Sequence, residues 1–250
     1  MNYLEDFAII QLQGSDAIKI LHNLATNSIH ERDFSTTYTC ILTPNGRFMF
    51  DFHLIQQNLQ KYIAINKNFQ EDFIKYISMY KMSADLHLEK TSLKLQHSFA
   101  KIDGFLADSR SQKLGFYAIK EAGNFDATTV YNANRIALKI ADGFWDLTQK
   151  ESIILDYGFD NLNAISYTKG CYLGQELISR TKHTGVLRKK VCGLKSQNDL
   201  TKGVDIFQND EKVGKVLGGF NGEYLALVNF ERANFDTQFA VENINVVVVQ

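Results

Sequence analysis

The sequence predicts an α+β protein that ends in a small β-barrel. In the first 189 residues, segments with apolar residues at every second position alternate with segments in which they recur every three to four positions, as strands and helices require. From residue 190 onward, only short strand-like segments remain, separated by turns rich in Gly, Asn and Asp. We therefore divide the chain into an α+β region, residues 1–189, and a β-barrel, residues 190–250.

The N-terminal half mixes strands with helices. A strand over residues 8–12 precedes a helix for which Ser15 or Asp16 is a suitable N-cap. The turn Pro44-Asn45-Gly46 joins two strands of a hairpin that spans residues 38–55. Asn68 and Glu71 resemble a capping box and open a second helix. Three further strands are predicted over residues 61–65, 84–90 and 93–101.

The second strand of the hairpin has two contrasting faces. Phenylalanines and a leucine alternate on one face, and polar residues that include Arg47, Asp51 and His53 occupy the other. We interpret the polar face as the solvent-exposed side of the hairpin. The alternative is a site in which Asp51, on the same face as the arginine, orients a ring nitrogen or accepts a proton.

The middle of the chain has a strand over residues 116–119 and then a helix. The apolar stripe of this helix is predicted to contain Val130, Ala133, Ala137 and Ile140. Turn residues make residues 143–168 irregular. The barrel strands are predicted over residues 190–194, 204–207, 212–217, 224–229 and 244–249.

Composition restricts the classes of function. The 250 residues are 45% hydrophobic and 22% charged, which is typical of a globular protein, and the net charge of −1 gives no general attraction to nucleic acid or anionic membranes. The three cysteines are widely spaced and form no disulfide framework. The first residues have neither a secretory nor a transit-peptide pattern. We therefore expect a cytoplasmic protein without membrane contact and without a direct nucleic-acid partner.

The most reactive combination of residues lies between Lys169 and Arg180. The segment reads Lys169-Gly170-Cys171-Tyr172-Leu173-Gly174-Gln175-Glu176 and continues to Arg180. As a loop that enters a helix, it places Cys171 in the first turn, where the helix dipole and Lys169 favour the thiolate. Glu176 and Arg180 have the spacing of a helical ion pair. The two glycines leave room for a flat ligand or for another backbone.

Several simpler interpretations of this segment remain open. Cys171 is equally consistent with a small buried hydrophobe, and Glu176–Arg180 with an exposed pair of little energetic value. No second cysteine or histidine nearby completes a metal site, so we predict no resident metal, although a cluster shared between two chains is a further alternative. A hydrolase nucleophile is disfavoured because His183, the nearest histidine, belongs to no identifiable catalytic set.

The segment from Lys169 to Glu176, followed by Arg180 and residues 185–190, resembles the signature of the YgfZ-type folate-binding proteins. That family includes mitochondrial iron–sulfur cluster assembly factors and is related to the T-protein, the aminomethyltransferase of glycine cleavage. A weaker resemblance extends over nearly the whole chain. It includes the hairpin turn before Arg47, the acidic residue Asp51, and a middle motif from Asp108 to Gly115.

The resemblance implies a ring of three modules around a folate-sized hole, with two interleaved α+β modules and a C-terminal β-barrel. It implies a tetrahydrofolate-binding accessory protein for the assembly or maintenance of iron–sulfur clusters, which supports cluster enzymes including tRNA-modifying ones. Its partners would be folate and iron–sulfur assembly or client proteins. Cys171 would be the functional thiol, with Lys169 beside it. The candidate folate-binding residues are Asp51, Gly174, Gln175, Glu176 and Arg180.

Some residues depart from the family pattern. Ala137 stands where the T-protein has a glutamate near its pterin, which weakens both transferase chemistry and folate affinity. Tyr117 stands where relatives often have arginine. An assembly factor is therefore favoured over an enzyme. The alternatives are a folate-dependent aminomethyl- or methyltransferase and a protein adaptor that has lost folate.

Overall fold

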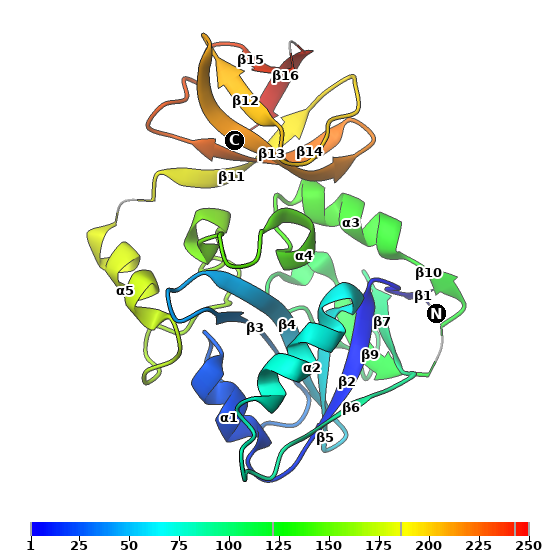
Figure 1. The fold of residues 1–250 in the computed structure, drawn as a ribbon. Coiled ribbons are helices and arrows are strands. Elements are labelled where there is room, and N and C mark those ends of the chain that lie inside the picture. The colour runs from blue at the N-terminus through cyan, green and yellow to red at the C-terminus, as the bar shows by residue number, and fades with distance from the viewer. Residues whose placement is uncertain (1, 122, 186, 243, 250) are drawn as a thin grey trace.

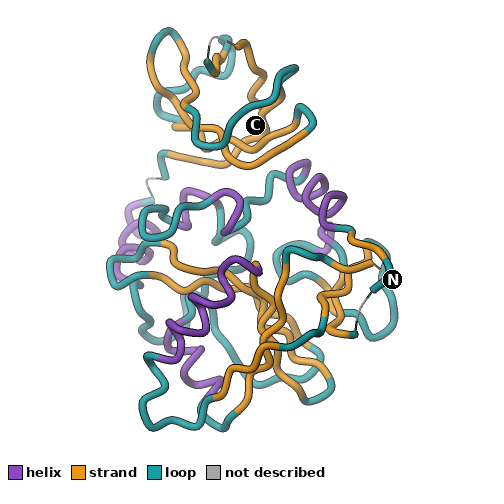
Figure 2. Tube along the Cα trace, turned by 45° about the vertical axis from the view of Figure 1, so that its right-hand side comes forward, coloured by secondary structure: helices purple, strands orange, loops and turns teal. Residues whose placement is uncertain are grey.

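The computed structural model describes residues 2–121, 123–185, 187–242 and 244–249. These residues form two five-stranded sheets and a closed six-stranded barrel. The barrel lies at one end of the molecule, and the two sheets with their helices form a larger body beneath it (Figures 1 and 2). The predicted α+β fold with a C-terminal barrel is confirmed.

The first sheet has the strand order β3-β4-β5-β2-β6. Its strands are β2 (Phe7–Gln13), β3 (Ser35–Leu42), β4 (Phe48–Gln57), β5 (Gln60–Asn66) and β6 (His87–Lys90). The helical elements in this part of the chain are α1 (Ala17–Leu24), the 3-10 helix η1 (Lys67–Phe69) and α2 (Gln70–Ser78). Helix α2 covers the phenylalanine face of β4, since the ring of Phe73 lies 5.5 Å from Phe50 and 5.2 Å from Phe52.

The second sheet has the order β10-β1-β7-β9-β8. Its strands are β1 (Asn2–Tyr3), β7 (Lys94–Ser98), β8 (Leu106–Ala107), β9 (Phe116–Lys120) and β10 (Phe125–Asp126), accompanied by η2 (Gln112–Leu114) and α3 (Thr128–Ala137). The chain begins in this sheet, leaves it to build the first sheet, and returns with β7. The two α+β modules are therefore interleaved in sequence.

A largely irregular segment then leads to the barrel. It contains α4 (Gly143–Asp146), η3 (Ile154–Tyr157) and α5 (Gln175–Thr184). The barrel order is β11-β14-β13-β12-β15-β16. Its strands are β11 (Lys189–Lys195), β12 (Asp205–Gln208), β13 (Glu211–Phe220), β14 (Glu223–Asn229), β15 (Phe239–Val241) and β16 (Ile244–Val249).

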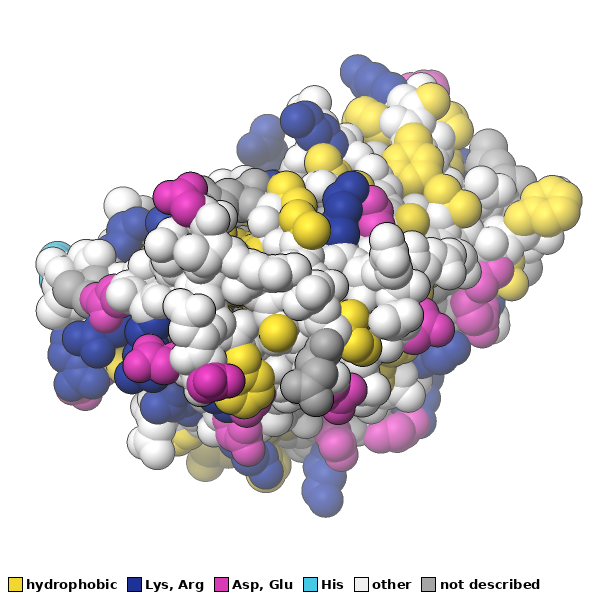
Figure 3. All heavy atoms as spheres, turned by 90° about the horizontal axis from the view of Figure 1, so that it is seen from above, with side chains coloured by type: hydrophobic (Ala, Val, Ile, Leu, Met, Phe, Trp, Pro, Cys, Tyr) yellow, Lys and Arg dark blue, Asp and Glu magenta, His cyan; other side chains and the backbone are white. Residues whose placement is uncertain are grey.

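The barrel has its own core and a second apolar contact with the body. Cys192, Val216 and Ala226 lie among the residues that fill its interior, whereas Leu217, Leu225 and Leu227 join the core of the body. Viewed from above, the molecule shows charged side chains of both signs, with hydrophobic side chains scattered among them and most crowded at the upper right (Figure 3). The mixture of signs agrees with the near-neutral net charge.

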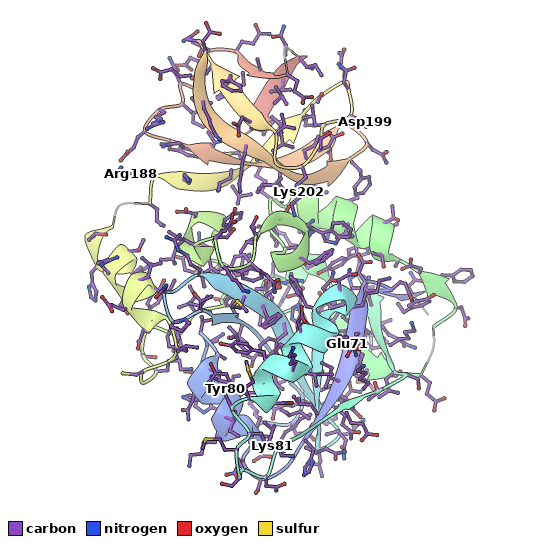
Figure 4. The ribbon with its side chains drawn as sticks, in the orientation of Figure 1. Glu71, Tyr80, Lys81, Arg188, Asp199 and Lys202 are labelled. Carbon is purple, nitrogen blue, oxygen red and sulfur yellow. The ribbon has the colours of Figure 1, made fainter. Side chains whose placement is uncertain are left out.

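Asp146 of α4 connects the barrel to the body. Its Oδ2 accepts hydrogen bonds from Arg135 Nη1 at 2.6 Å and from the Asp142 amide at 2.7 Å, and its Oδ1 accepts from the Gly218 amide of β13 at 2.8 Å. Both Asp146 and Arg135 are buried. At the same joint, Lys202 reaches from the barrel and donates to the Phe144 carbonyl at 3.4 Å (Figure 4). One buried carboxylate thus links α3, α4 and the barrel.

The structure corrects two predictions about which side chains face solvent. The polar face of β4 is not exposed: Asp51 and His53 are 7% and 1% exposed, because β9 and the start of α4 pack over them. On α3, Val130 of the predicted apolar stripe is 60% exposed, whereas Arg135 is buried at 2%. In both places, distant segments of the chain decide which face becomes internal.

Candidate functional site

The signature segment forms a loop that leads into α5. The helix begins at Gln175, and Gly174 precedes it in a left-handed conformation with φ of +80°. Cys171 lies four residues before the helix and is exposed. Our prediction that Cys171 occupies the first helical turn is therefore wrong, because the left-handed glycine delays the start of the helix.

Lys169 anchors this loop to the end of α1 through hydrogen bonds. Its Nζ donates to the carbonyls of His22, Ala25 (2.7 Å) and Asn27 (3.0 Å). An ammonium group has three donors, so these carbonyls use all of them. Burial lowers the pKa of Lys169 to about 8. The structure thus gives Lys169 an anchoring contact rather than a free ammonium group.

Two glycines bring the hairpin turn against α5. A Cβ on Gly174 would lie 2.4 Å from the Thr43 carbonyl oxygen, and a Cβ on Gly46 would lie 2.6 Å from Cβ of Leu177. Neither position has room for a side chain. Gly174 therefore serves the close approach of another backbone, which was one of the two roles that the sequence allowed.

The outer side of this segment forms a surface that we call the signature face. Its members are exposed: Tyr167, Gly170, Cys171, Glu176, Arg180 and Lys182. Lys182 Nζ lies 5.0 Å from the ring centroid of Tyr167 and 3.4 Å from Asp160 Oδ2. Within the described part of the chain, no ion pair joins Glu176 to Arg180, so that predicted pair is not formed.

Cys171 differs from the other two cysteines, and the structure describes all three. Cys40 and Cys192 are buried, and burial raises the pKa of both thiols, that of Cys192 to about 11. A buried thiol with a raised pKa is inert toward large reagents. Cys171 is therefore the cysteine that a partner in solution can reach.

Asp51 lies in the interior of the body, apart from the signature face. Its Oδ2 accepts hydrogen bonds from the Tyr38 hydroxyl at 2.7 Å and from the Gly143 amide at 3.1 Å. The pKa of Asp51 is raised to about 7, mainly by burial and secondly by the negative charge of the nearby Asp142. No hydrogen bond or ion pair in the described residues joins Asp51 to Gln175, Glu176 or Arg180. Asp51 is buried, whereas the candidates Glu176 and Arg180 are exposed.

A buried polar cluster surrounds Arg110. The guanidinium binds the Asp108 carboxylate through Nη2 at 2.8 Å and Nε at 3.2 Å, and lies 4.8 Å above the Tyr38 ring. The hydroxyls of Tyr117 and Tyr131 complete the cluster, 3.1 Å from each other. The family departure at Tyr117 thus adds a hydroxyl that donates to Asp108. Sequence reasoning singled out Asp108 and Arg110 but missed the contributions of Tyr38 and Tyr131.

His53 is buried beside this cluster. Its ring lies 4.9 Å from Tyr38 and 5.5 Å from Tyr117, and neither ring nitrogen has a hydrogen-bond partner in the described residues. The pKa of His53 is lowered to about 3, mainly by burial and secondly by the positive charge of Arg110. The strand register of the predicted hairpin could have shown that His53 lies beside Tyr38, because the two residues are cross-strand partners.

The burial of His53 predicts a dependence of stability on pH. The unfolded chain takes up a proton on this residue below its ordinary pKa of about 6.5, whereas the folded chain does so only near 3, so stability falls as pH falls between these values. His53→Phe should remove this loss, which is about 5 kcal/mol over the full interval and about 3 kcal/mol between pH 7 and 4. Urea unfolding at pH 7, 5 and 4 measures the difference. The control His183→Gln alters an exposed histidine and should follow the wild type; identical pH dependence in His53→Phe would contradict the prediction.

A cavity of about 410 Å³ lies between α3, α4 and the barrel. It is lined by Asp6, Thr128, Thr129, Asn132, Arg135, Ile136, Trp145, Gly218, Gly219 and Phe220. Trp145 is the single tryptophan of the chain and is 39% exposed. Aromatic and aliphatic walls with a few polar groups suit a flat heterocyclic ligand. Sequence reasoning did not identify this cavity, because its walls come from widely separated segments.

No family model matches the chain. An iron–sulfur cluster assembly factor IBA57 homologue of Mycosarcoma maydis is 26% identical over 219 residues, covering 74% of this chain and 54% of the relative. The mouse iron–sulfur cluster assembly factor IBA57 is 25% identical over 278 residues, covering 91% of this chain and 77% of the mouse protein. This chain is similar in sequence to iron–sulfur cluster assembly factors named IBA57. The family resemblance stated from the signature is confirmed.

A solved structure supports the fold. The glycine cleavage system aminomethyltransferase T of Bartonella henselae has a TM-score of 0.78 with 12% identity, covering 99% of this chain and 84% of that one. The T-protein-like architecture is therefore confirmed. The chain spans about half the length of the Mycosarcoma relative.

The comparisons overturn the predicted location. Both IBA57 relatives are described as mitochondrial, so the expectation of a cytoplasmic protein is wrong. Among the described residues, no helix has the length and apolar character to cross a bilayer.

Proposed function

We propose that this chain assists the assembly or maintenance of iron–sulfur clusters by presenting Cys171 to a protein partner. The observation that supports this most is the exposure of Cys171 on a loop held by Lys169 and by the close packing of Gly174. The names of the IBA57 relatives support the same role. The enzymes that benefit would be cluster enzymes, including those that modify tRNA.

A protein partner follows from the number of ligands. Iron in a cluster is held mainly by several cysteine thiolates, and no group of three His, Cys, Asp or Glu side chains in the described residues is arranged to hold a metal. A cluster that contacts Cys171 therefore takes its remaining ligands from another molecule. The cluster is cargo in this proposal, and the signature face is the surface that meets its carrier.

The role of Cys171 is testable with matched cysteine variants. In the native protein, one of the three thiols should react rapidly with Ellman's reagent, and Cys171→Ser should abolish that reaction. In cells that lack the wild-type protein, Cys171→Ser should lose the activity of cluster-dependent enzymes. Cys192→Ala, which removes a buried cysteine, should retain that activity at equal protein level. Full activity of Cys171→Ser would sink the proposed role.

We further propose that a folate occupies the cavity beside Trp145. The flat pterin ring suits the aromatic lining from Trp145 and Phe220, and the Asn132 amide and the Asp6 carboxylate offer polar partners for its edge. This location replaces the candidate set from the signature. Gly174 is occupied by backbone packing, Glu176 and Arg180 lie on the signature face, and Asp51 already accepts two protein hydrogen bonds.

The single tryptophan makes this site directly measurable. Tetrahydrofolate should quench the fluorescence of Trp145 in a saturable manner, because ligand and indole would be in contact. Phe220→Ala should weaken binding at least tenfold, which corresponds to about 1.4 kcal/mol. Phe207→Ala, an exposed phenylalanine elsewhere on the barrel, should bind like the wild type. Absence of saturable quenching would exclude folate from this cavity and would leave the role of Cys171 untouched.

A further inference from the structure

A second cleft, of about 390 Å³, lies between the body and the barrel. One wall comes from the hairpin turn and the segment around η3, and the other from β11, β13, β14 and the turn after β14. Its lining includes five cationic side chains: Arg47, Lys189, Lys212, Lys215 and Arg232. Glu151 and Asp156 are the carboxylates of the lining. The cleft therefore has an excess of three positive charges in a chain whose net charge is −1.

Protein carboxylates neutralise few of these cations. Lys212 pairs with Asp205 at 2.7 Å, and Arg47 Nη1 donates to the Glu151 carbonyl at 3.0 Å. Lys189, Lys215 and Arg232 make no ion pair with any described residue. Glu231, which follows the end of β14, is paired with Arg188 at 3.2 Å, the arginine labelled in Figure 4.

The barrel wall is built by regular strand pairing. Lys189 is the cross-strand partner of Asn229, and Lys215 has two cross-strand partners, Leu227 on β14 and Asp205 on β12. Leu227 packs in the core of the body, so this side of the barrel faces the body rather than the barrel interior. A Cβ on Gly214 would lie 2.7 Å from the Leu227 carbonyl oxygen, so this position holds β13 close to β14. The lysines of this wall are thus fixed at their Cα positions by the sheet.

Cationic side chains from both walls of the cleft act electrostatically on the Asp156 carboxylate. Asp156 of η3 is partly buried, and burial raises its pKa, while Lys189 from the barrel and Arg47 from the hairpin turn both act in the opposite direction. Cations from opposite walls are therefore near one carboxylate. An anion that entered the cleft would meet the same two cations, with Lys215 and Arg232 still unpaired.

We infer that this cleft binds a small oligoanion through its carboxylate or phosphate groups. The volume is in the range of small-molecule sites, which begins at about 300 Å³. Unpaired cations in a concave site concentrate and hold anions, and arginine adds bidentate hydrogen bonding. The site is separate from the cavity beside Trp145 and from the signature face, and it does not depend on the function proposed above.

Calorimetry on the full chain tests the inference, with pyrophosphate and citrate as separate probes. At low ionic strength, at least one probe should bind, and its affinity should fall as sodium chloride is raised. Lys189→Ala/Lys215→Ala should weaken binding at least tenfold. Lys195→Ala, which removes another lysine of β11 outside the cleft lining, should bind like the wild type. Tighter binding of pyrophosphate indicates a phosphate ligand, and tighter binding of citrate a carboxylate ligand.

Two results would overturn the inference. One is the absence of binding heat for both probes, and the other is equal affinity in the double variant and the wild type. If the double variant does not fold, Arg232→Ala provides the same test from an exposed position. Thermal unfolding of each variant separates a loss of binding from a loss of structure.

Discussion

Asp146→Ala is expected to lower the free energy of unfolding by about 3–5 kcal/mol, which is the usual cost of removing one partner of a buried ion pair. The substitution leaves the Arg135 guanidinium buried without its carboxylate. It also removes the acceptor for the amides of Asp142 and Gly218. Because Gly218 belongs to the barrel and Arg135 to the body, we expect the joint between these parts to loosen first. Urea unfolding, with native-state hydrogen exchange of the amides in β13, measures both effects.

Two control variants separate the charge from the hydrogen bonds. Asp146→Asn keeps an acceptor but removes the charge, so it should be intermediate between alanine and the wild type. Asp205→Ala breaks an exposed pair with Lys212 and should change stability by about 0–1 kcal/mol. A loss below about 1 kcal/mol in Asp146→Ala would contradict the assignment of this carboxylate as the link between body and barrel.

Gly174→Ala is the second substitution with a large expected effect. The φ of +80° places this residue in the left-handed region, which costs an alanine about 1–2 kcal/mol. The new Cβ would also lie 2.4 Å from the Thr43 carbonyl oxygen, and such overpacking typically costs about 1–3 kcal/mol. The expected loss of unfolding free energy is therefore about 2–5 kcal/mol. Urea unfolding measures this loss, and the labelling rate of Cys171 reports whether the loop has moved.

Gly170→Ala is a matched control within the same signature. A Cβ at Gly170 would meet nothing within 4 Å, so this variant should unfold like the wild type. Equal stability of the two alanine variants would show that the hairpin turn and α5 do not pack as closely as the structure describes. The comparison thus isolates the close approach of the two backbones from the general effect of replacing glycine.

For the candidate site, the local sequence predicted which segment is important but not the role of each residue in it. The resemblance of the segment around Cys171 indicated its importance, but two of its members proved to have structural roles. Lys169 binds carbonyl groups at the end of α1, more than 140 residues away in sequence, and Gly174 packs on the turn at Thr43 and Gly46. The sequence spacing of residues predicts neither contact, because it relates only residues within one helix or strand, and both contacts join distant segments.

Periodicity, turn residues and the signature are local properties of the chain, and they predicted most of the longer strands and helices, the C-terminal barrel and the family resemblance. They missed the short strands β1, β8, β10 and β15. Which polar residues are internal depends on the packing of distant segments, which the local sequence pattern does not show. Asp51 and His53 lie on a face that looks solvated in isolation, and Arg135 lies on a helix whose exposed side contains Val130. Burial of such residues depends on the segments that pack against them, and on whether a buried charge finds a partner such as Asp146. The exposure of Cys171 was decided in the same way, by the anchoring of its loop.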